Sequence, residues 1–85
     1  MIDNRIKQAI NNYIDVQREY NNVGMFSKQI NKNVIRLLYS NHIRVFYEKG
    51  IIEQNGRTIA TITKRYASRK KNGCYKELKP IINYI

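Results

Sequence analysis

Asn55-Gly56 is the local feature that most constrains the fold, because it lies between two strand-like runs, "GIIEQ" and "RTIATITKRY". A two-residue type I′ turn needs a positive φ at both central residues, and Asn-Gly is the pair most favoured there. The flanking runs are rich in Ile and Thr, whose β-branched side chains favour a pleated, half-buried surface. The sequence therefore predicts an antiparallel hairpin over residues 51–66.

The first residues of the chain predict a helix. Its apolar positions recur three and four residues apart and form one stripe: Ile2, Ile6, Ala9, Ile10, Tyr13 and Ile14. From Val16 the pattern changes, because Val16, Arg18 and Tyr20 alternate and Gly24 follows shortly after. We expect the helix to end near Asp15 and a short strand to follow. A continuous helix to Tyr20 is the alternative.

A second helix is predicted from Ser27 to Ser40. Ser27 is a suitable N-cap, because its hydroxyl can accept a hydrogen bond from a backbone N–H of the first turn. The helix has an apolar face of Ile30, Val34, Leu37 and Leu38 and an opposite, cationic face of Lys28, Lys32 and Arg36. After it, the run "IRVFYE" alternates as a strand does.

Together these segments predict an α+β fold, with two helices packed on a small antiparallel sheet in the order helix-strand-helix-strand-strand. We expect residues 1–66 to form this domain. The C-terminal tail, residues 67–85, is expected to begin with a basic loop and to end with a short apolar segment that contains Pro80. Tyr13, Tyr39, Phe46 and Tyr47 lie on or next to apolar stripes, so we expect them in the core.

Composition narrows the class of protein. The 85 residues include 16 Lys plus Arg and 6 Asp plus Glu, for a net charge of +10. A chain this short forms only a marginal core, which favours stabilisation by a partner. One cysteine and one histidine allow neither an internal disulfide nor a Cys/His metal cage. We therefore predict that the protein is not an enzyme and has no catalytic residues, cofactor, metal or small-molecule substrate. We also expect no membrane span, because no apolar run reaches the ~20 residues that one needs.

The positive charge is concentrated after Gly56. Residues 1–24 carry no net charge, whereas residues 57–85 contain eight basic residues and one acidic residue. Such an excess attracts polyanions through counterion release, and nucleic acid is the commonest of these. The candidate RNA-binding residues are Lys28, Lys32, Arg36, Lys64, Arg65, Arg69, Lys70 and Lys71. Tyr66 and Tyr75 flank the second group as candidate stacking residues. A solvated helix face and a solubilising loop are the alternatives for the two groups.

In their order along the chain, these features resemble the family of the eighth protein of the bacterial-type small ribosomal subunit, in an organellar form. The resemblance runs through "AINN", which contains Ile10 and Asn12, then "FSKQINKNVIRLLYSNHIRVF", "IIEQNGRTIATITKRY" and "CYKELKPI". The positions that match the family's motifs are Asn12, Ser27 and Lys28. The chain departs from the family by having Asn41-His42 in place of a glycine and by lacking the family's Ser-Thr-Ser-x-Gly loop.

The resemblance implies a structural constituent of the small ribosomal subunit that supports translation. It also implies that residues 1–66 form an RNA-binding domain and that residues 67–85 contain a basic loop and the start of a truncated second domain. The implied partners are ribosomal RNA and neighbouring ribosomal proteins, and the alternative to truncation is a separate polypeptide that supplies the second domain. The abundance of Ile (14), Asn (11), Lys (9) and Tyr (7), all with A/T-rich codons, favours an A/T-rich genome, such as that of an organelle, an endosymbiont or a virus. We therefore expect a mitochondrial ribosome, with a plastid or a bacterial or viral cytoplasm as the alternatives.

Two other functions fit the pattern of residues. The chain is also compatible with a winged-helix DNA-binding protein, in which residues 27–40 form the recognition helix and residues 51–66 form the wing. The third candidate is a small basic module that binds an acidic protein surface and no nucleic acid.

Overall fold

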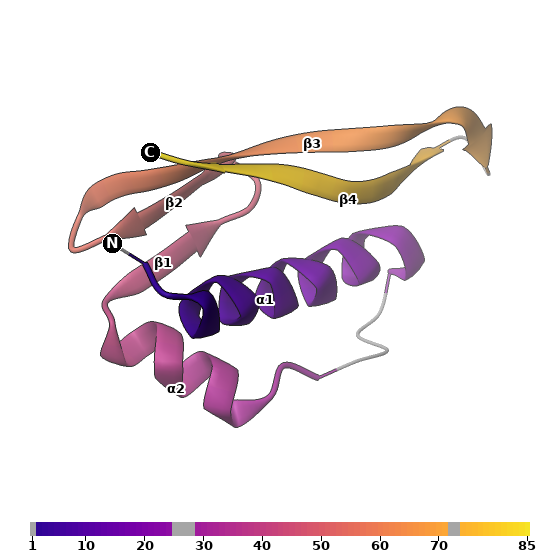
Figure 1. The fold of residues 1–85 in the computed structure, drawn as a ribbon. Coiled ribbons are helices and arrows are strands. Elements are labelled where there is room, and N and C mark those ends of the chain that lie inside the picture. The colour runs from indigo at the N-terminus through magenta and orange to yellow at the C-terminus, as the bar shows by residue number, and fades with distance from the viewer. Residues whose placement is uncertain (1, 25–28, 72–73) are drawn as a thin grey trace.

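The computed structural model describes residues 2–24, 29–71 and 74–85, without the side chains of residues 69–71 and 74. Its elements are α1 (Asn4–Val23), α2 (Lys32–Ser40), β1 (Ile43–Phe46), β2 (Ile51–Gln54), β3 (Arg57–Lys71) and β4 (Cys74–Tyr84). The strands form one antiparallel sheet in the order β1-β2-β3-β4, and both helices lie against one of its faces (Figure 1). The predicted α+β class, with helices packed on an antiparallel sheet, is confirmed.

Helix α1 is continuous through the segment where a strand was expected. The Asp3 side chain caps its start by accepting from the backbone N–H of Ile6 at 3.0 Å. At its end Gly24 adopts the left-handed conformation, with φ 75°, and its N–H donates to the carbonyl of Tyr20. The strand predicted to follow Asp15 is therefore wrong. The alternative of a continuous helix is correct, and the helix extends to Val23.

Helix α2 begins later than the sequence predicts. Residues 29–31 are not helical, and the N-cap is Asn31, whose side chain accepts from the N–H of Asn33 at 2.7 Å. Ser27, the predicted N-cap, lies outside the described residues. The helix ends at Ser40, and His42 follows with a positive φ of 56°.

The β2–β3 hairpin forms as predicted. Asn55 and Gly56 both have positive φ, 54° and 78°, as a type I′ turn requires. Opposite β2, the register shifts by one residue, so that Ile52 pairs with Ala60 and Glu53 with Thr58.

The tail is a strand pair and not a loop. β3 continues to Lys71, past the predicted boundary at residue 66, and β4 pairs with it in the same sheet. The predicted turn, Asn72-Gly73, lies outside the described residues. Pro80 is accommodated because β4 is an edge strand and has one extra residue opposite Lys64, between the pairs Thr63–Ile81 and Arg65–Leu78. Residues 74–84 thus complete the sheet that the hairpin begins.

The core lies between α1 and the covered face of the sheet. It consists of Ile6, Ala9, Ile10, Ile14, Leu38, Ile43, Tyr47, Ile52, Ala60 and Ile62. Tyr13 packs against this cluster, and Tyr47 is part of it, as expected. Tyr39 is 83% exposed, so the expectation that it belongs to the core is wrong.

Candidate nucleic-acid interface

The predicted cations fall into two groups on different parts of the fold. Lys32 and Arg36 are exposed on α2, which packs against α1 and β1 and makes no contact with the described parts of β3 or β4. Lys28 lies outside the described residues, and the other predicted cations, Lys64, Arg65, Arg69, Lys70 and Lys71, lie on β3, which pairs with β4. We call residues 64–79 the basic arm. Figure 1 shows that this arm extends beyond the end of α1.

Lys64 belongs to the basic arm but is engaged with its neighbours. Its ammonium donates to Glu48 Oε2 at 2.9 Å and lies 4.6 Å from the centre of the Tyr47 ring. Its side chain is 20% exposed. The hydrogen bond and the positive charge of Lys64 lower the pKa of Glu48. Lys64 is therefore less available to RNA than the sequence analysis expects.

Arg65 and Tyr66 are exposed on the arm. Arg65 pairs with Leu78 across the ladder, and Tyr66 pairs with Glu77. Tyr66 is 52% exposed, so its ring is accessible. Arg69, Lys70 and Lys71 occupy the end of β3, and their side chains lie outside the description.

Lys76 and Lys79 are exposed cations of the arm that the sequence analysis did not select. They line a hollow of about 420 Å³ between β4 and the end of α1, together with Arg18, Glu19, Asn22, Val23, Glu77 and Leu78. Both lysines are visible in the sequence as "KELK", but the prediction places this segment in a second domain and not on the sheet. Once β4 pairs with β3, these two lysines extend the cationic surface onto a second strand.

A hydrogen-bonded network fixes the arm to α1. Asn22 Nδ2 donates to the carbonyl of Glu77 at 2.9 Å, and the N–H of Glu77 donates to Asn22 Oδ1 at 2.8 Å. The Tyr47 hydroxyl donates to Glu77 Oε1 at 2.9 Å. Burial, and then the hydrogen bond and charge of Glu77, raise the pKa of the Tyr47 hydroxyl. The orientation of the arm is thus set by contacts between segments far apart in the sequence.

The family-matched residues do not gather at the arm. Asn12 is exposed on α1 and lines a hollow with Asp15, Val16, Ile30, Asn31 and Val34. Ser27 and Lys28 lie outside the described residues. Of the cationic face predicted for the second helix, Lys32 and Arg36 lie on α2, whereas residues 29–31 are not helical.

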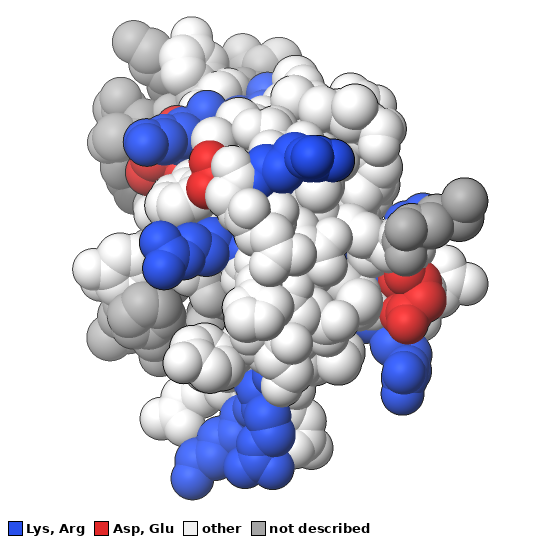
Figure 2. All heavy atoms as spheres, turned by 90° about the vertical axis from the view of Figure 1, so that its left-hand side faces the viewer, with Lys and Arg blue, Asp and Glu red and all other residues white. Residues whose placement is uncertain are grey.

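Positive charge is also distributed over the end of the molecule near the β2–β3 turn. Figure 2 shows Lys and Arg side chains at several separate places on this side. α2 lies at the lower end of the view, and blue side chains gather there. This side has scattered cations, whereas the arm has cations in succession along two paired strands.

The described residues contain no cluster of three His, Cys, Asp or Glu side chains arranged to hold a metal ion. None of the helices formed by these residues is both long and apolar enough for a membrane span.

Comparison with protein-family models, with curated proteins and with solved structures finds no match for this chain.

Proposed function

We propose that this protein is a structural RNA-binding component of a small ribosomal subunit in an organelle, most simply a mitochondrion. It binds ribosomal RNA by charge and shape and supports translation without catalysing a reaction. The ribosomal assignment is motivated by the sequence resemblance, and the RNA-binding assignment is motivated by the basic arm. Neighbouring ribosomal proteins, including a separate polypeptide in place of the second domain, are the proposed protein partners.

The observation that carries the proposal is the uneven placement of cations on the longest strands. β3 and β4 span 15 and 11 residues, whereas β1 and β2 span four each. The basic arm, where β3 and β4 extend beyond the short strands, carries most of the net charge of the chain. Arg65, Lys76 and Lys79 are exposed on this arm. Successive cations along a rigid strand pair can neutralise successive phosphates, which is the sequence-independent part of RNA recognition. Tyr66 adds an exposed ring beside these cations, suitable for stacking on an unpaired base.

The winged-helix alternative receives less support. A wing is a hairpin that projects from its domain, whereas β3, the second strand of the predicted wing, lies between β2 and β4 inside the sheet. The predicted recognition helix is shorter than expected, since α2 spans only Lys32–Ser40.

The salt dependence of RNA binding tests the proposal. The double variant Lys70→Ala with Lys71→Ala should lower the slope of log K against log[salt] for small-subunit ribosomal RNA by about 1–2 units, since each lost phosphate contact removes about 0.7–0.9. The variant Lys76→Ala with Lys79→Ala should have a similar effect. The matched control is Lys32→Ala with Arg36→Ala, which removes the same charge from α2.

Equal effects of all three variants would contradict a specific role for the arm. Sedimentation of the native protein tests the ribosomal assignment separately: the protein should travel with small-subunit particles. Co-purification with duplex DNA would favour the winged-helix alternative instead.

A further inference from the structure

β1 is an edge strand whose outer backbone groups are available. The N–H of Asn55 donates to the carbonyl of His42 at 3.2 Å, which identifies these two residues as a hydrogen-bonded pair. Hydrogen-bonded pairs alternate with non-hydrogen-bonded pairs along an antiparallel ladder. The N–H and C=O groups of Ile43 and Val45 therefore point away from β2, and no other element of the described chain gives them a backbone partner.

The two edges of the sheet differ in their protection. β4 carries Lys76, Lys79, Pro80 and an irregular register, all features that discourage another strand from pairing. β1 is short, with four residues, and its only charged side chain is Arg44. It has no proline and no register shift against β2. The edge of β1 is thus the more open of the two.

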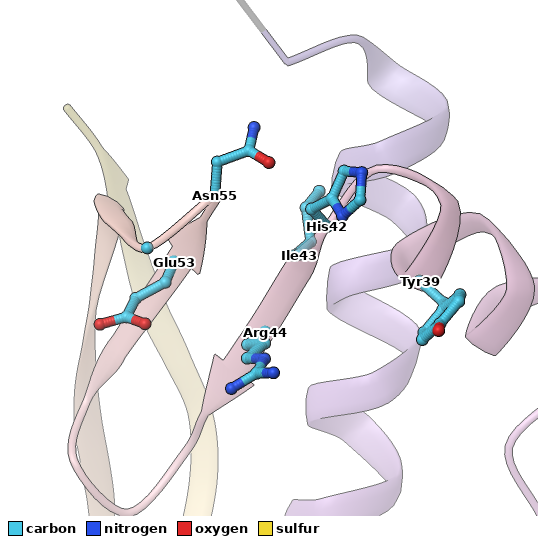
Figure 3. A pocket seen from close by; sticks show the side chains of 7 residues that line it. Tyr39, His42, Ile43, Arg44, Glu53 and Asn55 are labelled. Carbon is cyan, nitrogen blue, oxygen red and sulfur yellow. The ribbon is translucent and has the colours of Figure 1, made fainter.

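An apolar groove of about 310 Å³ follows the edge of β1. It is lined by Tyr13, Ile35, Leu38, Tyr39, Ile43, Arg44, Val45 and Phe46. A second hollow, of about 490 Å³, shares Tyr39, Ile43 and Arg44 with it and extends to the Asn55-Gly56 turn. Figure 3 shows this hollow between Tyr39 on the α2 side and Glu53 and Asn55 on the β2 side. Ile35 is 49% exposed and Tyr39 83% exposed, so apolar surface beside the free edge faces solvent.

Cations flank this groove. Lys32 and Arg36 are exposed on α2, each three residues before an apolar residue of the groove, so each pair is adjacent on the helix surface. Arg44 lines the groove, and the ammonium of Lys49 lies 5.2 Å from the centre of the Phe46 ring. Of the nearby acidic residues, Glu53 pairs with Arg44 across the ladder and Glu48 is held by Lys64.

We propose that the edge of β1, with the groove beside it, binds an extended acidic segment of a partner protein, which adds to the sheet as a fifth strand. Backbone hydrogen bonds to Ile43 and Val45 supply the pairing, alternate apolar side chains enter the groove, and acidic side chains meet the flanking cations. A second copy of this chain is a poor occupant, because two copies with a net charge of +10 repel each other. RNA lacks the peptide groups that pair with a strand edge.

Titration of the isotope-labelled full chain, followed by NMR, tests this inference. The probe is a synthetic peptide of about six residues, the usual length of a strand, with alternating Glu and Val. The amide signals of Ile43 and Val45 should shift, and their hydrogen exchange should slow. The control peptide, with Lys in place of Glu, should bind at least about tenfold more weakly.

Two variants separate edge pairing from loss of the fold. Val45→Pro removes an N–H that does not bond to β2, so binding of the peptide should be lost while β2 and β3 amides stay protected. Because this proline could unfold the edge strand, a second variant, Tyr39→Ala, is needed. The Tyr39 side chain is 83% exposed, so its removal should leave the fold intact. Binding of the peptide should weaken by about tenfold. Tyr66→Ala, which removes an exposed tyrosine of the basic arm, is the matched control and should leave peptide binding unchanged.

Three results would overturn the proposal. One is the absence of shifts at Ile43 and Val45 at any peptide concentration. Another is concentration-dependent shifts of these amides in the protein alone, which would indicate a second copy at this edge. The third is a stronger response of the same amides to oligouridylate than to the acidic peptide, which would indicate a nucleic-acid surface. Since the peptide is proposed to bind the outer edge of β1, and RNA the exposed cations of the basic arm, none of these results depends on the RNA-binding proposal.

Discussion

At the scale of single residues, Gly50 and Gly24 have nearly the same backbone conformation in very different surroundings. Their φ angles are 76° and 75°. A Cβ on Gly50 would lie 2.9 Å from the carbonyl oxygen of Ile62, whereas a Cβ on Gly24 would meet no atom of the described residues within 4 Å. The N–H of Ile62 also donates to the carbonyl of Gly50 at 2.7 Å, which holds β3 against this glycine.

We therefore expect Gly50→Ala to destabilise the fold more than Gly24→Ala does. Both variants incur the cost of a left-handed residue with a side chain, about 1–2 kcal/mol. Gly50→Ala adds a collision with backbone, which raises the total by about 1–3 kcal/mol. Urea unfolding measures the difference. Equal losses of the free energy of unfolding would show that β3 moves away from Gly50 at no cost.

Removal of a buried tyrosine hydroxyl should change the free energy of unfolding differently at Tyr47 and at Tyr84. The Tyr47 hydroxyl donates to Glu77, whereas the Tyr84 hydroxyl is buried and has no hydrogen-bond partner among the described residues. Tyr47→Phe should lower the free energy of unfolding by about 1 kcal/mol. Tyr84→Phe should be neutral or stabilising, because it removes an unsatisfied polar group. Denaturant unfolding of the two variants at neutral pH checks this, and a loss in Tyr84→Phe equal to that in Tyr47→Phe would contradict it.

The raised pKa of Tyr47 gives an alkaline pH dependence. An unfolded tyrosine loses its proton near pH 10, while burial keeps Tyr47 protonated in the folded state. Above about pH 10, unfolding therefore releases a proton. The contribution of Tyr47 to the free energy of unfolding is fully present below that pH and is lost as the pH rises. Above pH 10, the free energy of unfolding of Tyr47→Phe should fall less steeply with pH than that of the unsubstituted protein. The difference in slope should be up to about 1.4 kcal/mol per pH unit. Identical slopes in the two proteins would mean that Tyr47 ionises equally in both states.

The role of a residue could be predicted from the sequence where that role depends only on its neighbours in the chain. Asn55-Gly56 forms the predicted turn because both φ angles follow from the two residues themselves. The role of Lys64 was not predictable, since it depends on Tyr47 and Glu48, which a turn and a strand bring beside it. A count of cations cannot distinguish such a lysine from an exposed one.

At the scale of elements, α1 shows why three alternating residues are weak evidence for a strand. Val16 is buried, and it lines a hollow with Ile30 and Val34, residues that precede and begin α2. Arg18 pairs with Asp15 at 3.3 Å, and residues three apart are neighbours on a helix but lie on opposite faces of a strand. The alternation reflects this second packing surface of α1, which is not visible until α2 is placed.

Asn22 should be the residue that couples α1 to the basic arm. Asn22→Ala removes both hydrogen bonds to the backbone of Glu77 and leaves a part-buried N–H and C=O without partners, at a cost of about 1–3 kcal/mol. Hydrogen exchange at Glu77 should also become faster. Asn21→Ala is the matched control, because Asn21 makes only a 3.5 Å exposed contact with Glu48. Equal effects of the neighbouring substitutions would show that this contact does not hold the arm.

β3 and β4 are the elements that the sequence analysis predicted least well. The second arm of the hairpin was recognised to residue 66, but Arg69, Lys70 and Lys71 suggested a loop because charged runs are usually solvated. Strand pairing with residues 74–84 overrides that preference. Two of the seven cations of the basic arm, Lys76 and Lys79 on β4, were missed for the same reason. Their recognition required the pairing partner, which is information beyond the local sequence.

At the scale of the whole molecule, a small core supports a large net charge. The fully buried large side chains are Ile10, Ile14 and Ile52, and the chain carries +10 on a body of 39 × 26 × 20 Å. Like charges at these separations repel, and salt screens them: the Debye length falls from about 30 Å at 0.01 M to about 3 Å at 1 M. We therefore expect the isolated protein to be least stable at low salt, the condition in which the proposed binding of RNA would be strongest.

We expect the thermal midpoint of the isolated protein to rise with NaCl. A gain of about 1 kcal/mol from screening corresponds to about 4–8 °C for a domain of this size. Replacing Lys70, Lys71 and Lys79 with Gln should raise the midpoint at low salt and flatten its dependence on NaCl, because it removes three charges from the arm. If RNA binds the folded arm as proposed, RNA added at low salt should stabilise the protein more than an equivalent ionic strength of NaCl does. Circular dichroism melting curves give all three quantities. A midpoint that is high at low salt and unaffected by NaCl or RNA would show that neither self-repulsion nor a bound polyanion controls the stability of this fold.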